Sequence, residues 1–195
     1  MTPLTGRPRD QRAFTLVELM VTVAVLAILT MVAVPHFRDL TRRHQISSVT
    51  HVLLTDLAYA RTEAIMRAMF VSVCPSIDGT RCTVTADYAP GWLVYAYPVT
   101  LGANKAYVGG TTDFTLLRHT TARSGVVVMA EDSKIITYGQ QGQLKRPDAD
   151  VPIRLVICTA TAENTAAVPG SRLEVSGSGS ASAKVLALGD GCSPA

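Results

Sequence analysis

The sequence predicts an α+β protein in which one long N-terminal helix packs on an antiparallel β-sheet domain. Three observations support this fold class. An apolar run long enough to cross a bilayer lies near the start of the chain, an apolar stripe at helical spacing follows it, and short β-branched segments bounded by turn residues fill the remainder. Helical and strand signals that are segregated along a chain are typical of α+β proteins.

The first element is the apolar run at residues 14–34. Hydrophobic residues make up 48% of the 195-residue chain and charged residues 17%, yet this run holds one ionisable residue, Glu18, in 21 positions. About 20 apolar residues span a bilayer core as a helix. A cleaved secretory signal is shorter and has its small residue after the run, whereas Ala13 precedes this one. We therefore expect a transmembrane segment at residues 14–35.

The segment before it, residues 1–13, is short and basic. It carries Arg7, Arg9 and Arg12 against a single acid, Asp10. By the positive-inside rule this end stays in the cytoplasm. Everything after the span is then expected on the far side of the membrane.

The helical signal continues beyond Pro35 because residues 36–69 contain no glycine and no further proline. One apolar stripe repeats there at intervals of three and four residues; it consists of Ile46, Val49, Leu53, Leu57, Ala60 and Ala64. Membrane helices tolerate a proline, so one helix is predicted from about Phe14 to about Met69. Its second half, residues 36–69, is amphipathic and needs a domain to lie on.

Residues 70–195 are predicted to form that β-rich domain. Short segments rich in β-branched residues and bounded by Gly, Pro, Asp or Ser indicate strands. These segments are residues 70–75, 91–99, 114–120, 125–130, 134–139, 153–158, 172–177 and 184–189. Asp78 and Gly79 indicate a hairpin turn, and the Gly/Ser-rich residues 176–184 are expected to be flexible.

Four cysteines, Cys74, Cys82, Cys158 and Cys192, all follow the predicted span. An even number in an oxidising compartment indicates two disulfides. Three pairings are possible, of which Cys74 with Cys82 and Cys158 with Cys192 closes the smallest loops. The spacing of the first two cysteines does not match a zinc site.

The sequence contains no residue pattern that indicates an enzyme, a metal site or a cofactor site. His36, His44, His51 and His119 have no acidic or thiol ligands at matching spacing, and no catalytic or nucleotide-binding motif is present. The net charge of +3 is too small to indicate nucleic-acid binding by itself. We therefore expect neither an enzyme nor a metal or cofactor site.

The stretch "RAFTLVELMVTVAVLAILTMVAVPHF" resembles the class III signal of type IV pilins and type II secretion pseudopilins. The resemblance implies that a prepilin peptidase cuts between Ala13 and Phe14 and methylates the new amine of Phe14. Glu18 matches the family's glutamate at the fifth position after the cut, and Pro35 its proline at the twenty-second. Ala13 stands where the family usually has glycine. The family lies in the bacterial inner membrane with a periplasmic domain until it enters a filament.

The resemblance gives Glu18 and Pro35 roles in assembly. A carboxylate in a bilayer costs about 2.5–3.5 kcal/mol on insertion scales, so such groups are kept where they find a partner. In a filament, Glu18 can face the N-terminal ammonium of a neighbouring subunit; the alternative is a hydrated carboxylate near the interface. Pro35 either kinks the helix, or marks where it melts during assembly, or is an incidental helix end.

Three further stretches resemble the GspH/FimT group of minor pilins and pseudopilins. They are the Asp-Leu-x-x-Ala-Arg-x-Glu-Ala stretch at residues 56–64, the V-x-V-C-P strand at residues 71–75, and the pair Gly91 and Trp92. The resemblance implies the type IV pilin fold and a non-catalytic subunit at or near a filament tip that helps to initiate assembly. The implied partners are the prepilin peptidase, other pilins or pseudopilins, and inner-membrane lipid.

A second function is DNA capture during natural transformation. FimT-like members of the group use a Gly-Arg-x-Arg motif near the C-terminus, but the matching "SGSGSASAKV" retains only Lys184 as a basic residue. Phosphate attraction needs several cations acting together. Another patch could be formed by Arg118, Arg123, Lys145, Arg146, Arg154 and Arg172, unless these are ordinary solvated charges.

Some single residues also carry expectations. Trp92 is expected in the core under the helix, and Arg61 is expected to pair with an acidic group of the domain. Arg38, Arg42 and Arg43 follow the predicted span and are expected to contact lipid headgroups or neighbouring subunits, or simply to be solvated.

Overall fold

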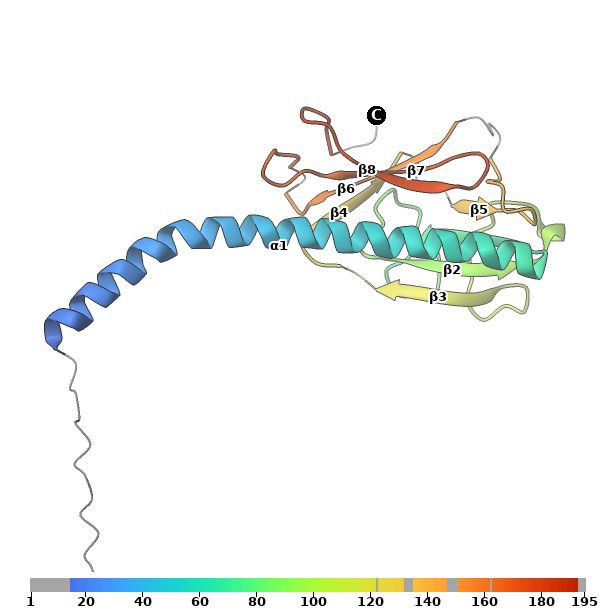
Figure 1. Ribbon diagram of the computed structural model, residues 1–195. Helices are drawn as coiled ribbons and strands as arrows, with labels where there is room; N and C mark the ends of the chain where they lie inside the picture. Colours follow the sequence, from blue (N-terminus) through green and yellow to red (C-terminus); the bar gives the residue numbers. More distant parts are fainter. Residues whose placement is uncertain (1–14, 122, 132–134, 147–150, 162, 193–195) are drawn as a thin grey trace, which may run out of the picture. The chain divides into compact units, whose positions relative to one another are not determined.

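The computed structural model describes residues 15–121, 123–131, 135–146, 151–161 and 163–192. Within these residues one long helix, α1 (Leu16–Arg67), is followed by strands and one short 3-10 helix, η1 (Val99–Leu101), as Figure 1 shows. The chain divides into two compact units, Met1–Arg38 and Asp39–Ala195, and α1 contributes residues to both. The predicted α+β order and the single long helix are confirmed.

Within the second unit, α1 buries the apolar stripe that the sequence predicts. All six members of the stripe are buried, and four of them, Leu53, Leu57, Ala60 and Ala64, have no exposed surface. They belong to one hydrophobic cluster with side chains from both sheets of the domain. Full burial of a leucine side chain stabilises a fold by about 1.5–3 kcal/mol, so this stripe anchors the helix to the domain.

The first sheet is antiparallel and has four strands in the order β3-β2-β1-β5. The strands are β1 (Phe70–Pro75), β2 (Gly91–Tyr97), β3 (Thr115–Thr121) and β5 (Ile136–Tyr138). Alternate residues of β2 face opposite sides, so Trp92 and Val94 join the cluster under α1 whereas Tyr95 and Tyr97 face away from it. Trp92 is fully buried, as predicted.

The second sheet is also antiparallel, in the order β4-β6-β7-β8. Its strands are β4 (Val126–Ala130), β6 (Ile153–Thr159), β7 (Ser171–Val175) and β8 (Ala181–Val185). Val128, Leu155 and Leu173 from three of these strands are fully buried in the same cluster as the helix stripe. The two sheets therefore share one core, which is organised around α1.

The outer face of the first sheet carries a second, aromatic cluster. Tyr95 has its ring centroid 5.7 Å from that of Tyr97 and 5.3 Å from that of Tyr107. Phe114 packs on all three tyrosine rings at centroid distances of 5.4–5.9 Å. Burial raises the pKa of the Tyr95 hydroxyl. Because the loops that supply Tyr107 and Phe114 cover this face, β2 is buried on both sides.

Two details of the predicted β domain are wrong. The last strand is not at residues 184–189: β8 ends at Val185 and includes residues 181–184 of the segment expected to be flexible. Asp78 and Gly79 do form a turn, in which Asp78 Oδ1 accepts a hydrogen bond of 2.9 Å from the Thr80 amide and the pKa of Asp78 is lowered by that bond. The turn does not close a tight hairpin, because β1 ends at Pro75 and its partner β2 begins only at Gly91.

Candidate functional site

The described part of α1 before Asp39 presents apolar side chains around its whole circumference. Leu16 is 75% exposed, Leu26 64% and Phe37 70%. The most apolar window of the helix has a mean hydropathy of 2.5, and none of it is buried in the structure. An exposed apolar surface of this size marks contact with a membrane or another protein. By length and composition this is a helix that can cross a bilayer.

The first turn of this helix is capped by Thr15. The Glu18 amide donates a hydrogen bond of 3.2 Å to Thr15 Oγ1. A threonine followed three residues later by a glutamate is the signature of a capping box, which satisfies amide groups that the first turn would otherwise leave free. Sequence reasoning missed this local role, although the T-x-x-E spacing of Thr15 and Glu18 was the signal for it.

The carboxylate of Glu18 has no hydrogen bond or ion pair with any residue that the structure describes. Its backbone amide is used in the cap, but the side chain lies in an exposed apolar surface. A charge in apolar surroundings is costly unless it is paired. Glu18 is therefore available for a partner that the described chain does not supply.

The other predicted residues of the processing motif are Ala13, Phe14 and Pro35, and of these the structure describes only the backbone of Pro35. Ala13 and Phe14 lie outside the described residues. Pro35 lies within α1, which continues to Arg67. The possibility that Pro35 is an incidental helix end is therefore wrong, and the predicted continuation of the helix past the proline is confirmed.

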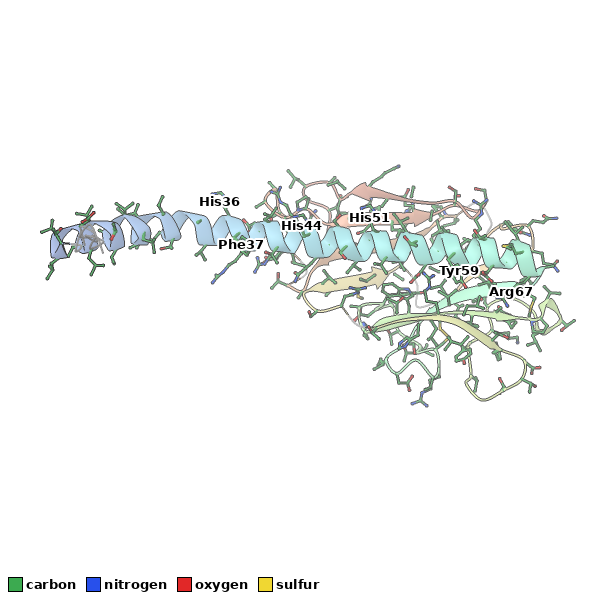
Figure 2. All side chains as sticks on the ribbon, turned by 60° about the horizontal axis from the view of Figure 1, so that its bottom comes forward. His36, Phe37, His44, His51, Tyr59 and Arg67 are labelled. Atoms are coloured by element: carbon green, nitrogen blue, oxygen red, sulfur yellow. A yellow bond between two sulfur atoms is a disulfide. The ribbon has the colours of Figure 1, made fainter. Side chains whose placement is uncertain are left out.

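Within the second unit, a buried carboxylate fastens α1 to the first sheet. Asp56 is 1% exposed, and its Oδ2 accepts hydrogen bonds from Trp92 Nε1 at 2.8 Å and Thr120 Oγ1 at 2.7 Å. Its Oδ1 accepts one from Arg118 Nη1 at 2.5 Å. The Arg118 guanidinium also lies 4.4 Å from the ring centroid of Tyr59, which Figure 2 labels on the same helix.

The position of Asp56 on α1 is a sequence signal for this cluster. Asp56 follows Leu53 by three residues and precedes Ala60 by four, so it lies on the apolar stripe itself. A carboxylate on an otherwise apolar helix face has to be paired when the face is buried. Its partners Arg118 and Thr120 are distant in sequence, which is why no local pattern identified them.

The expected acidic partner of Arg61 is not found. Its guanidinium instead donates to two backbone carbonyls, from Nε to Gly142 O at 3.0 Å and from Nη2 to Ser178 O at 3.0 Å. Glu63, two residues further on, pairs with Arg67 at 2.5 Å. Arg61 thus joins α1 to the loop after β5 and to the β7–β8 turn.

The structure contains two disulfides, which pair Cys74 with Cys82 and Cys158 with Cys192. This is the pairing with the smallest loops among the three that the sequence leaves open. The first ties the end of β1 to the loop that follows it, and the second ties β6 to the C-terminal segment. Among the described residues, no group of three or more His, Cys, Asp or Glu side chains is placed to hold a metal ion.

A long N-terminal helix that is bare and apolar in its first half and packed on antiparallel sheets in its second defines the class of type IV pilin-like proteins. Two crystal structures of the type IV minor pilin FimU of Pseudomonas aeruginosa share this fold with TM-scores of 0.53 and 0.50. The first is 17% identical and covers 78% of this chain and 96% of its own; the second is 16% identical and covers 74% and 95%. The minor pseudopilin EpsH of Vibrio cholerae matches with a TM-score of 0.44 and 16% identity over 75% of this chain and 99% of its own.

The chain belongs to the family described as type II transport protein GspH. The family model matches residues 50–179, which are two-thirds of the chain. The prokaryotic N-terminal methylation motif matches residues 8–34, which contain the predicted cleavage position. No curated protein matches the chain. The resemblance to type IV pilins and to the GspH/FimT group is thereby confirmed.

Proposed function

We propose that this chain is a minor pilin or pseudopilin that sits at or near the tip of a type II secretion pseudopilus or a type IV pilus and helps to initiate its assembly. The observation that carries the proposal is the bare apolar helix with an unpaired Glu18 carboxylate, within a segment that matches the methylation motif. Such a helix needs lipid before assembly and neighbouring helices afterwards. The chain acts as a structural subunit and not as an enzyme.

Processing and assembly are coupled in this proposal through Glu18. Hydrolysis of the Ala13–Phe14 peptide bond by a prepilin peptidase frees the amine of Phe14, which is mostly protonated at neutral pH. Methylation of that amine keeps its positive charge. The ammonium of one subunit can then neutralise the Glu18 carboxylate of its neighbour within the apolar filament core, where a charge pair is less screened than in water.

We further propose that the unprocessed chain crosses the inner membrane once, with its basic N-terminal segment in the cytoplasm and its β-rich unit in the periplasm. Arg7, Arg9 and Arg12 before the apolar run fit a cytoplasmic end, but Arg38, Arg42 and Arg43 follow the run in equal number, so the arginines do not decide the orientation. The two disulfides also fit an oxidising compartment. Pro35, inside α1, lacks the amide proton for one helical hydrogen bond and is where we expect the helix to kink or melt when a subunit leaves the bilayer.

Replacing Glu18 tests the pairing directly. We expect Glu18→Ala to insert and be cleaved as the wild type is, but to enter filaments at least several-fold less, because the neighbour's ammonium loses its counter-charge. Immunoblots of sheared filament and membrane fractions measure both steps. Thr15→Val is the matched control, since it removes the cap at a cost of about 1 kcal/mol but keeps the carboxylate. Unchanged incorporation of Glu18→Ala would rule out the pairing.

The processing site is tested by the intact mass of the chain isolated from membranes. We expect residues 1–13 to be absent and one methyl group to be present on Phe14. The same preparation from cells without the prepilin peptidase should retain the leader. A full-length mass in cells that contain an active peptidase contradicts the pilin proposal.

DNA capture is the alternative function, and three of its six candidate cations pair with acidic side chains of the chain itself. Arg118 pairs with Asp56, and Arg172 pairs with Asp190 at 3.0 Å. Arg154 lies 3.5 Å from a Glu174 oxygen. A gel shift with the full chain in detergent decides this alternative: retardation of double-stranded DNA at low salt that fades as salt rises would support it.

A further inference from the structure

Within the unit Asp39–Ala195, an open hollow lies between the first turns of α1 and the segment that leads into β4. It has a volume of about 500 Å³. It is lined on the helix side by Thr41, His44, Gln45 and Ser48 and on the other side by Arg123 and Ser124, over the buried Val49. Figure 2 labels His44 on this part of α1.

The chemistry of the hollow suits an anion that has several oxygen atoms. Its polar lining offers a guanidinium, an imidazole, an amide and hydroxyl groups, and none of the lining residues is acidic. The structure records no side-chain hydrogen bond or ion pair for Arg123 or His44 with any residue it describes. An unpaired guanidinium next to hydroxyl donors is a common way for proteins to bind phosphate.

The walls of the hollow are held in place by backbone contacts. The Arg123 amide donates to Ala89 O at 3.2 Å, and Gly125 O accepts from the Ala160 amide at 3.0 Å. Gly125 has a φ of +87°, and a Cβ there would lie 2.7 Å from Gln45 Oε1, so the glycine lets the Gln45 side chain pack closely. A site that is already formed loses less entropy when it binds.

The hollow is also close along the helix to the apolar segment. From Phe37 to His44 α1 advances about 10 Å, since each helical residue adds about 1.5 Å. The headgroup layer outside a bilayer core is of similar depth, about 5–8 Å on each side. Three further arginines, Arg38, Arg42 and Arg43, and one acid, Asp39, lie within this interval. The lining of the hollow thus begins within the reach of a lipid headgroup.

We propose that this hollow binds the phosphate of an anionic phospholipid headgroup, with Arg123 as its main cation and His44, Ser48 and Ser124 as further donors. The proposal rests on the proposed membrane anchoring of the chain and adds a specific lipid contact to it. Before assembly, this contact would hold the β-rich unit against the membrane surface. Extraction of the subunit into a filament would then break it.

The test uses the full chain in nanodiscs of equimolar phosphatidylglycerol and phosphatidylcholine, with native mass spectrometry of the lipids it retains. We expect the wild type to retain phosphatidylglycerol preferentially. Arg123→Gln should lower that preference about fivefold, the effect of one cation at a membrane surface, and His44→Gln should lower it less. Equal circular dichroism spectra and melting temperatures establish that the variants are folded.

Two charge-matched variants separate this site from general electrostatic attraction. Lys105→Gln removes an exposed lysine whose amide donates to the Tyr97 hydroxyl, at the end of β2. Arg123 lies near the opposite end of β2, because its amide donates to Ala89 O, two residues before Gly91. Lys184→Gln removes a cation from another hollow beside α1, of about 290 Å³. Both should keep the wild-type preference. An equal loss in either control, or no loss in Arg123→Gln, overturns the proposal.

Two further outcomes identify the source of the phosphate and the failing step. If millimolar inorganic phosphate displaces the retained lipid as fully as Arg123→Gln does, the site binds free phosphate and the lipid assignment is wrong. Insertion is scored separately by resistance to carbonate extraction. An inserted chain without lipid preference refutes the headgroup contact alone, whereas a chain that fails to insert refutes the anchoring as well.

Discussion

Asp56 is a carboxylate whose hydrogen-bonding capacity is used almost entirely inside the protein. It receives one charged and two neutral donors, from Arg118, Trp92 and Thr120. Burying a charge is unfavourable unless such partners replace its water. Arg118 keeps 43% of its side chain exposed, so only one of the two charges is fully desolvated. The cluster therefore fixes the register between α1 and β2–β3 in addition to any stability it adds.

Removing the Asp56 carboxylate should destabilise the second unit strongly. We expect Asp56→Ala to lower the free energy of unfolding by about 3 kcal/mol, because the buried Trp92 donor and the half-buried Thr120 donor are left unpaired. Thr120→Val removes a single neutral donor and should cost only about 1 kcal/mol. Urea unfolding followed by the fluorescence of Trp92, the single tryptophan, measures both. Equal effects would show that the carboxylate is not the centre of the cluster.

At the scale of elements, the β7–β8 hairpin shows what the sequence pattern could not predict. The β-branched and leucine-rich residues 184–189 look more strand-like than the small residues of β8. Ala181 and Ala183 nevertheless pair with Val175 and Leu173 across the hairpin. The turn is closed by the Ser176 amide, which donates to Ser180 O at 2.9 Å. The partner strand and the turn decide the register, and neither is visible in a local propensity.

Gly179 in this turn occupies a position that only glycine fits without strain. It has a φ of +80°, and an added Cβ would lie 1.9 Å from Gly142 O, the carbonyl that Arg61 also binds. We expect Gly179→Ala to cost at least about 3 kcal/mol, from backbone strain and from displacement of the Gly142 loop. Gly110, with a φ of +82° and open space around it, is the matched control: Gly110→Ala should cost only about 1 kcal/mol of strain. Chemical unfolding of both variants gives the difference, and similar losses would contradict a role for the Gly142 contact.

The long helix and the first strand were more predictable for a physical reason. Helical period and membrane-length apolarity are properties of contiguous residues, so the stripe from Ile46 to Ala64 could be identified without its partners. β1 is likewise bounded by local signals and has the predicted limits, Phe70–Pro75. The division of the strands into two sheets depends on contacts such as Leu155 and Leu57 in one cluster, which are distant in sequence.

At the scale of the whole molecule, both sheets of the second unit pack on α1. One disulfide joins each sheet to a neighbouring segment of the chain. The first sheet gains a covered outer face from the loop that supplies Tyr107, and Cys82 belongs to the same cluster. The second sheet has a smaller cluster of its own, in which Cys158 packs with Leu186. Each disulfide therefore joins a buried strand to a segment with little regular structure. Sequence alone could rank the cysteine pairings by loop length but could not show these two separate surroundings.

The two disulfides should contribute unequally to stability. Cys74 and Cys82 are separated by 8 residues and Cys158 and Cys192 by 34. A cross-link that closes a longer loop removes more entropy from the unfolded chain, which gives about 2.5 kcal/mol for the short loop and about 4 kcal/mol for the long one. Replacing each pair by alanines and measuring urea unfolding of the full chain in detergent tests this order. The comparison is close to matched, since Cys74 and Cys158 are both fully buried and their truncation costs are similar. If loss of Cys74–Cys82 proved the more damaging, the disulfide beside the aromatic cluster would be acting through packing of the folded state rather than through the unfolded chain.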